Sequence, residues 1–309
     1  MSVRPLPSAR PAVRRAEVAG SFYPADARRL APLVERILAG AVRVDLEPGP
    51  AGRVTRPGLL AGLLVPHAGL AYSGLVAAAG WRRVAMAWPD APVTVVLLGT
   101  NHGAPWLDGV AGWGVGAWQT PLGDVATDDE LADGIVGLGP PFLLDRAAHL
   151  GEHSIEVQLP LLQVVAPRAR IVPLAVSAGT GVEAIVAGAR LGRLLAARRA
   201  MGHAVLLAIS SDMAHYPPAQ ACARVTDELL PPILRLDAAS LARHEATLVE
   251  GDIPGLVCGM CGIEPAVLGL AALRAMGIGP GTRLAAATSA DAGGPLDRAV
   301  GYLSVAWTT

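Results

Sequence analysis

The chain has 309 residues, a net charge of −1, and 52% hydrophobic against 17% charged residues. This composition is typical of a compact folded protein and excludes intrinsic disorder. The balanced charge gives no electrostatic basis for binding nucleic acid or an anionic membrane surface, so we expect neither as a partner. All 25 basic residues are arginines, and the absence of lysine excludes a Walker-type phosphate loop, a Schiff-base lysine and a pyridoxal-phosphate site.

The cysteines and the amino-terminal segment indicate the cellular compartment. Three cysteines form no spaced framework, which argues against a secreted disulfide scaffold. The first 18 residues lack the apolar core of a signal peptide. No apolar run approaches the roughly 20 residues that a membrane helix needs. We therefore expect a soluble, cytoplasmic protein.

The spacing of apolar residues predicts an alternation of helices and strands. Helices are expected over residues 26–38, 73–86, 128–138, 154–165, 181–200, 220–249 (broken near Pro231-Pro232) and 264–276. Strands are expected over residues 59–65, 93–99, 170–176, 204–209, 283–289 and 299–307, with a hairpin or irregular strands over 109–118.

Two further segments are expected to lie outside this pattern. Residues 1–15, rich in proline and arginine, predict a flexible lead-in, and residues 41–57 predict a surface loop. Because strands alternate with helices elsewhere, we expect an α/β fold with a mixed, largely parallel central sheet flanked by helices. No linker and no internal repeat interrupts the pattern, so residues 16–309 are expected to form a single domain.

Three of the predicted strands end in polar residues. Pro66 ends the first strand, since proline cannot donate to a sheet ladder, and His67 follows it. His102 follows the second strand, and Asp212 and His215 follow the third. A single histidine at a strand end is more often a hydrogen-bonded structural residue. Three such positions together indicate a site, because α/β proteins keep their chemistry at these ends and imidazole binds metals or moves protons.

Glu152 and His153 stand together at the start of a predicted helix. They are candidates for the site, because they place an acid beside an imidazole. The alternative is a capping arrangement, in which Glu152 or Ser154 accepts hydrogen bonds from free helix N–H groups. The two interpretations are compatible.

The segment after the third strand is the most polar strand exit in the chain. Asp212 is placed to orient His215, as a carboxylate fixes a neutral tautomer or steadies an imidazolium. Ser210 or Ser211 beside this pair suggests a hydrolase nucleophile as an alternative. The chain lacks a Gly-x-Ser-x-Gly motif there, so that signal is weak.

Cys258 and Cys261 have the spacing of zinc sites and redox motifs, but no second pair completes a four-thiolate site. Cys261 is the better candidate for a single ligand, because it directly precedes a predicted helix. A helix N-terminus lowers a thiol pKa and favours the thiolate that binds metal. The remaining cysteine and three of the histidines are expected to be structural or surface residues: Cys222, His149, His203 and His244.

Together these motifs closely resemble those of the Memo family, whose bacterial branch is called AmmeMemoRadiSam system protein B. The resemblance extends over most of the chain. It rests on Ala19–Pro24, Pro66–Gly69, Tyr72–Gly74, Leu98-Gly99 with His102, Thr120–Gly123, Glu152–Glu156, Ser210–Asp212 with His215, and Cys261-Gly262 with Pro265.

The resemblance implies a fold similar to that of class III (LigB-type) non-heme iron extradiol dioxygenases, which hold Fe(II) with two histidines and a carboxylate. By this resemblance His67 and His102 match the histidine ligands, and Cys261 occupies the third position. Two features depart from the pattern. Gly103 stands where the family often has a second histidine, and a thiolate replaces the carboxylate, which makes zinc or copper more competitive with iron.

The resemblance also assigns the surroundings of the metal. His215 matches the acid/base histidine, with Asp212 beside it. Phe22 and Tyr72 resemble residues of the pocket wall. The same comparison implies that two further residues line or support the cleft: Glu152 and His153.

Three functions follow as hypotheses. The first is a metal-dependent oxidoreductase of the dioxygenase type, with Fe(II) as the first choice of cofactor and zinc or copper as alternatives. The second is a non-enzymatic module that binds a peptide, metabolite or partner protein in the same cleft. The third, a zinc-dependent hydrolase, fits the ligands but has no support in the family. The name of the bacterial branch implies a shared pathway with a radical-SAM protein and an AMMECR-type protein.

Overall fold

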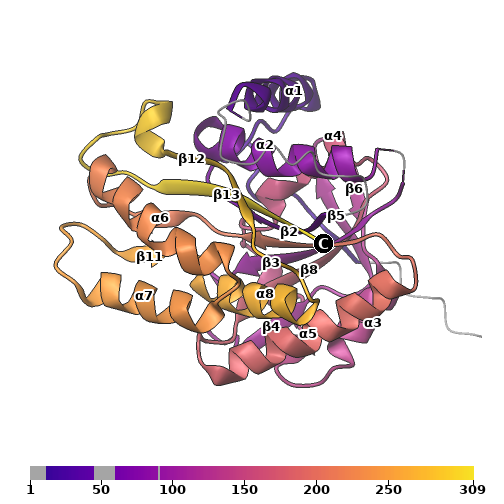
Figure 1. The fold of residues 1–309 in the computed structure, drawn as a ribbon. Coiled ribbons are helices and arrows are strands. Elements are labelled where there is room, and N and C mark those ends of the chain that lie inside the picture. The colour runs from indigo at the N-terminus through magenta and orange to yellow at the C-terminus, as the bar shows by residue number, and fades with distance from the viewer. Residues whose placement is uncertain (1–11, 45–59, 90) are drawn as a thin grey trace, which may run out of the picture.

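The structure, a computed structural model, describes residues 12–44, 60–89 and 91–309. At its centre lies an eight-stranded sheet with the order β12-β13-β2-β9-β3-β8-β4-β7 (Figure 1). The strands are β12 Thr282–Thr288, β13 Gly301–Thr308, β2 Leu60–Val65, β9 Val205–Ser210, β3 Thr94–Thr100, β8 Arg170–Ser177, β4 Gly109–Gly112 and β7 Phe142–Leu144. β2, β9, β3 and β8 run parallel, and β13 and β4 flank them antiparallel. The predicted mixed, largely parallel sheet is confirmed.

The central strands are buried on both faces, which explains why they are continuous apolar runs in the sequence. In β3, Val95 and Leu97 belong to the hydrophobic cluster on one face, and Val96 and Leu98 belong to the cluster on the other. Since successive side chains of a strand point to opposite faces, each central strand contributes to both cores.

Helices cover both faces of the sheet (Figure 1). Their bounds are α1 Ala27–Val44, α2 Leu70–Ala87, α3 Asp129–Val136, α4 Leu159–Val165, α5 Val182–Ala200, α6 Ala219–Leu234, α7 Ala238–Glu250 and α8 Ile263–Ala275. One face is covered by α1, α2 and α4, which contact one another, and the other by α5 and α8, with α7 against α8. Gly188 and Gly192 allow α5 to approach α8, because a Cβ at either position would collide with a carbonyl oxygen of α8.

Two small sheets and three 3₁₀ turns complete the fold. β1 Ala12–Arg14 pairs with β5 Gly116–Thr120, which also pairs with β6 Gly123–Ala126. β10 Met213–His215 pairs with β11 Cys258–Met260 just beyond the end of β9. The 3₁₀ turns are η1 Ala147–His149, η2 Glu156–Gln158 and η3 Ser289–Ala292.

The structure differs from the sequence-based expectation at the amino terminus. Residues 12–14 of the expected flexible lead-in form strand β1, and the side chain of Arg14 is buried. The rest of that segment, residues 1–11, lies outside the described residues. Of the expected loop over 41–57, residues 41–44 continue helix α1, and the remainder also lies outside the described residues.

Several helix boundaries also differ. α1 includes Pro32, as expected, but continues past the expected end at residue 38 to Val44, because apolar positions on its buried face continue to Ala41. α6 likewise contains Pro231 and Pro232 and ends only at Leu234, and Asp237 then caps α7. The helix expected over 154–165 begins at Leu159, and irregular chain and η2 precede it. No helix in the described ranges combines the length and apolarity that crossing a membrane requires.

Candidate metal centre

The parallel strands bring the predicted site residues to one edge of the sheet. His67 follows β2, His102 follows β3 and Asp212 follows β9, and these three strands are neighbours. The imidazole rings of His67 and His102 lie edge to face, with their centroids 5.4 Å apart. Because carboxyl ends of parallel strands meet at one edge, residues far apart in the sequence become neighbours here.

Cys261 reaches the same point from the small β10–β11 sheet, whose two strands are joined through α6 and α7. It follows β11 and precedes α8, and its backbone N–H donates to the carbonyl oxygen of Asp212 at 3.2 Å. Its sulfur lies 3.2 Å from Nε2 of His67. One nitrogen from each of His67 and His102 and the sulfur of Cys261 all lie within 4.8 Å of one another. These three residues form a group that can hold a metal ion.

Hydrogen bonds fix which nitrogen of His67 is available. The hydroxyl of Ser210 donates its only proton to the carbonyl oxygen of Ser154 at 2.6 Å, and it accepts from Nε2 of Gln158 at 2.9 Å. Its contact of 3.1 Å with Nδ1 of His67 therefore requires that Nδ1 carries the proton and donates. The lone pair of His67 is left on Nε2, the nitrogen that faces Cys261.

Glu152 fixes His102 in the same way. Its carboxylate lies 3.0 Å from Nδ1 of His102 and accepts the backbone N–H of that residue at 2.7 Å. Burial works to raise the pKa of Glu152, but the hydrogen bonds and charge of His102 and the backbone N–H of Ser154 outweigh it, so the pKa lies well below its usual value. An ionised carboxylate only accepts, so Nδ1 of His102 carries a proton, and in the neutral form of the ring the lone pair lies on Nε2.

His153 closes one side of this group. Its ring stacks on that of His102, with centroids 4.5 Å apart, and contacts the ring of Phe22 at 4.6 Å. Burial, with the neighbouring His102, lowers its pKa to about 4. Glu152 also accepts the backbone N–H groups of His153 and Ser154, so its carboxylate both orients His102 and satisfies local backbone donors.

His215 and Asp212 form a second pair at the same place. Nε2 of His215 lies 4.0 Å from a carboxylate oxygen of Asp212, is buried, and has no hydrogen-bond partner among the described residues. Burial lowers the pKa of His215 to about 4. Burial also raises the pKa of Asp212 to about 7, although its other oxygen accepts the backbone N–H groups of His67 and Ala68. The imidazole is therefore neutral and able to accept a proton.

Backbone strain marks the residue that follows. Tyr216 has a φ of 74°, in the left-handed region that residues other than glycine rarely adopt. Its ring lies 5.4 Å from that of His215, and the guanidinium of Arg298 sits 4.2 Å above it. Such strained positions cluster at functional sites, where the surrounding structure holds them.

The comparisons with known proteins identify the family. A family model described as Memo-like protein matches residues 14–306. The chain belongs to the Memo family. A MEMO1 family protein of Aquifex aeolicus is 35% identical over 95% of this chain and 98% of its own length. A MEMO1 family protein of Methanopyrus kandleri is 34% identical over 94% of this chain and 98% of its own length.

Among solved structures, this Memo-family chain is similar to an uncharacterized protein of Escherichia coli K12. The TM-score is 0.48 with 18% sequence identity, over 80% of this chain and 99% of that chain.

The structure brings together most of the residues expected from the Memo resemblance. Tyr72 lies in the first turn of α2 with 51% of its surface exposed, and its expected place in the pocket wall stays a prediction. Ser210 is not oriented as a nucleophile, because its proton is committed to a backbone carbonyl. Cys222 is fully buried and, as expected, belongs to the core.

The pKa of Cys261 corrects one expectation. The thiol directly precedes α8, but burial raises its pKa well above the usual value, and the nearby carboxylate of Asp212 adds to the effect. The thiol of the metal-free protein is therefore protonated, because desolvation outweighs the helix N-terminus. A bound cation would reverse this balance and stabilise the thiolate.

Sequence reasoning missed the residues that support the ligands from behind. Gln158 donates to Ser210 and to the carbonyl oxygen of Pro66, and it accepts from the indole N–H of Trp81 at 2.8 Å. Arg14 and Tyr23 both contact the carboxylate of Glu156. For Gln158 the sequence did carry a signal, because it is a polar residue inside an apolar run. For Arg14 the sequence carries no signal of a buried, supporting role.

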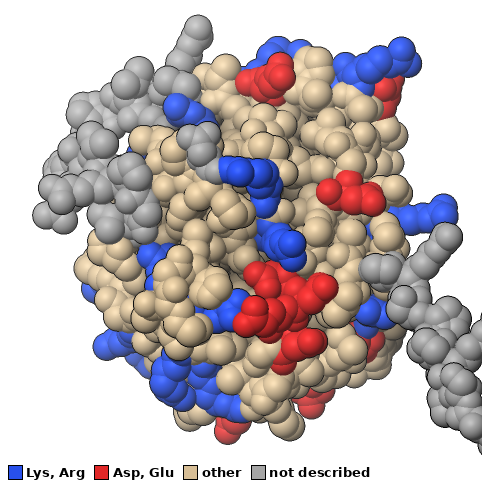
Figure 2. All heavy atoms as spheres, turned by 90° about the vertical axis from the view of Figure 1, so that its right-hand side faces the viewer, with Lys and Arg blue, Asp and Glu red and all other residues tan. Residues whose placement is uncertain are grey.

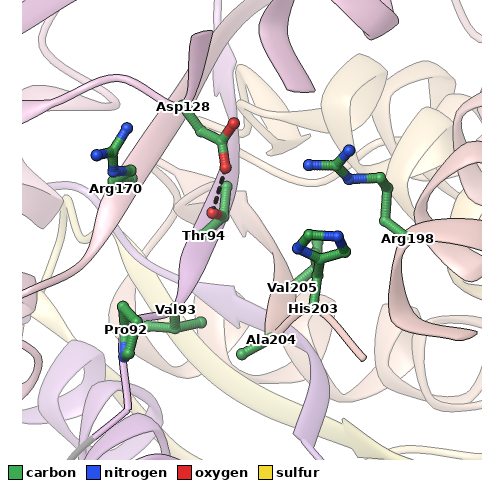
Figure 3. Close-up of a pocket in the computed structure, with 9 residues that line it drawn as sticks. All are labelled: Pro92, Val93, Thr94, Asp128, Arg170, Arg198, His203, Ala204 and Val205. Atoms are coloured by element: carbon green, nitrogen blue, oxygen red, sulfur yellow. Dashed lines mark hydrogen bonds between the residues drawn. The ribbon is translucent and has the colours of Figure 1, made fainter. Parts of the chain in front are cut away.

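A separate cavity of about 190 Å³ lies at the opposite edge of the sheet, at the amino ends of β3, β8 and β9 (Figure 3). Its polar groups have structural roles: Asp128 accepts from Thr94 at 2.6 Å and caps α3, and Arg198 pairs with Glu130 on the surface. Figure 2 shows that acidic and basic side chains lie side by side on this face.

Proposed function

We propose that this Memo-family protein is a metal-dependent oxidoreductase whose metal is bound by His67, His102 and Cys261. The observation that carries the proposal is the convergence of three donor atoms within 4.8 Å, with both imidazole protons held on the outward nitrogens by Ser210 and Glu152. This arrangement fits a metal ion, because ligating histidines characteristically donate their other N–H to a fixed acceptor.

The donor set favours Fe(II) first, with zinc or copper as alternatives. Two imidazoles and one anionic ligand leave coordination positions open, as in non-heme iron oxygenases, whereas the softer thiolate favours zinc or copper. When bound, a redox-active ion would supply these open positions and the electron chemistry. The redox-inert alternative, zinc, would instead support only Lewis-acid or hydrolytic chemistry.

The protein's own residues supply proton transfer and an aromatic wall. His215 is neutral and buried with Nε2 unpartnered among the described residues, so it can take a proton from a substrate hydroxyl and return it. Asp212 faces the resulting imidazolium at 4.0 Å and stabilises its charge. His153 and Phe22 provide neighbouring aromatic rings against which a flat substrate can pack. By the family resemblance, we further propose that a radical-SAM protein and an AMMECR-type protein act in the same pathway.

The test is the metal content of protein purified without oxygen, in wild type and in the variants His67→Ala and Cys261→Ser. Cys258→Ser is the matched control, because it removes the neighbouring thiol outside the ligand group. We expect stoichiometric iron in the wild type and the control, and loss of it in both ligand variants. Oxygen uptake with catechol-like substrates then tests the reaction class. Absence of metal in the wild type after reconstitution would refute the proposal and favour a non-enzymatic binding module.

A further inference from the structure

A buried arginine lies behind the metal site. The side chain of Arg14 in β1 has no exposed surface, and its guanidinium lies 4.2 Å above the ring of Trp118. All five of its N–H groups have acceptors. These are the carbonyl oxygen of His149 at 2.8 Å, that of Glu152 at 2.6 Å, that of Arg15 at 3.3 Å, and carboxylate oxygens of Glu156 at 2.5 Å and Glu17 at 3.3 Å.

Three of these acceptors belong to one loop, residues 149–156. Arg14 holds the loop at its start, in its middle and at its end, through His149, Glu152 and Glu156. The carboxylate of Glu156 is itself fixed from the other side, where it accepts the hydroxyl of Tyr23 at 2.5 Å and the backbone N–H of Val18 at 3.0 Å. The amino-terminal segment therefore clamps this loop.

The clamped loop carries the group that orients His102. The carbonyl oxygen of Glu152 accepts from Arg14, and the side chain of the same residue accepts from Nδ1 and the backbone N–H of His102. A shift of this peptide would move the carboxylate and release the imidazole. We propose that Arg14 is a positioning residue of the metal site, which acts through Glu152 to hold His102 with its proton on Nδ1 and its lone pair on Nε2.

The functional meaning of this role rests on the proposed metal site. The predicted tautomer of His102, however, is a property of the metal-free protein and can be measured without metal. A fork of five donors explains why arginine occupies the position. Lysine carries the same charge but only three donors on one nitrogen, so it cannot reach both backbone carbonyls and the carboxylate together. Arg14→Lys therefore keeps the buried charge and breaks the clamp.

The experiment has two readouts. Long-range ¹H–¹⁵N NMR spectra of the metal-free protein report which nitrogen of His102 is protonated, and titration with cobalt(II) reports metal affinity. In Arg14→Lys we expect a mixture of tautomers and a dissociation constant for cobalt(II) raised about tenfold or more, the usual effect of losing such a support. Leu195→Ala, a truncation on the buried face of α5, is the control for general destabilisation and should change neither readout.

A double-variant comparison shows whether Arg14 acts through Glu152. Glu152→Gln should raise the dissociation constant, and adding Arg14→Lys to it should raise it no further. Additive effects, or an unchanged tautomer and affinity in folded Arg14→Lys, would overturn the proposal.

If Arg14→Lys does not fold, Tyr23→Phe loosens the clamp more mildly, because it removes one hydrogen bond to Glu156. We expect the same tautomer shift in reduced measure, and an unchanged His102 in that variant would also overturn the proposal. A wild type that binds no cobalt(II) but shows the expected tautomers would refute the metal site and leave the positioning role intact.

Discussion

Replacing Ser210 by alanine tests how the site prepares His67 for a metal. The hydroxyl of Ser210 is the acceptor that keeps the proton of His67 on Nδ1. Without this acceptor, nothing stabilises the tautomer of the neutral imidazole that has its proton on Nδ1. In the other tautomer the proton lies on Nε2 and blocks the nitrogen that faces Cys261. The substitution removes no metal ligand and only one oxygen atom, so its effect on metal binding must pass through His67.

The structure sets the magnitude. Ser210→Ala removes contacts of 3.1 Å with His67, 2.6 Å with the carbonyl of Ser154 and 2.9 Å with Gln158, all of them buried. Gln158 keeps a second acceptor at 2.8 Å, the carbonyl of Pro66. Nδ1–H of His67 and the carbonyl oxygen of Ser154 are left without a partner, which predicts a loss of about 2–4 kcal/mol in the free energy of unfolding. For metal binding we expect a dissociation constant about 10- to 100-fold higher.

The assay is a titration with cobalt(II) or Fe(II) under nitrogen, beside urea unfolding of the metal-free protein. Ser304→Ala is the matched control: Ser304 is fully buried, and its hydroxyl has no hydrogen-bond partner within the described residues. That variant should bind metal as the wild type does and unfold at the same or higher urea concentration. A folded Ser210→Ala protein with wild-type metal affinity would refute the assignment of the His67 tautomer.

Two further predictions concern protons. Metal affinity should rise with pH, by up to about tenfold per pH unit, because the buried thiol of Cys261 must lose its proton on binding; in Cys261→Ser, titrated with cobalt(II), this dependence should flatten. Burial and the charge of Arg14 lower the pKa of His149 from 6.5 to about 4. As the pH falls, the unfolded state therefore takes up a proton on His149 before the folded state does. The free energy of unfolding is at its full value above pH 6.5 and decreases as the pH falls towards 4. The loss attributable to His149 is about 2 kcal/mol at pH 5. In His149→Gln, measured by urea unfolding between pH 7 and pH 4, this part of the loss should be absent, and an unchanged pH profile would contradict it.

The sequence predicted the position of the site well, for a physical reason. Strands buried on both faces are continuous apolar runs, and polar residues that end such runs stand at a sheet edge. His67, His102 and Asp212 could therefore be placed near one another before their strands were ordered. The position of Cys261 before a predicted helix made it a ligand candidate, but only the resemblance joined it to the two histidines, because nothing in its local spacing places β11 beside the end of β9.

The supports of the site could not be predicted in the same way. Arg14 and Glu156 are 142 residues apart in the sequence, and a proline- and arginine-rich beginning has the composition of a loose segment. Tertiary contacts order residues 12–14. These residues pair with β5, and every N–H of the Arg14 side chain has an acceptor. The local pattern also ended α1 at residue 38, whereas the helix, which includes Pro32 as expected, continues to Val44.

The thiol of Cys261 shows how the whole site is balanced. Burial lowers the pKa of His67, His153 and His215, so these imidazoles are neutral and offer lone pairs in place of charge. The same burial keeps Cys261 protonated, so in the metal-free protein the negative charge beside the histidines comes from Glu152 and not from the thiol. A divalent ion must therefore expel the thiol proton as it binds. Asp212 and His215 form one group with Cys261, with a donor atom of each within 4.8 Å of the sulfur, so a base able to receive that proton lies beside the thiol.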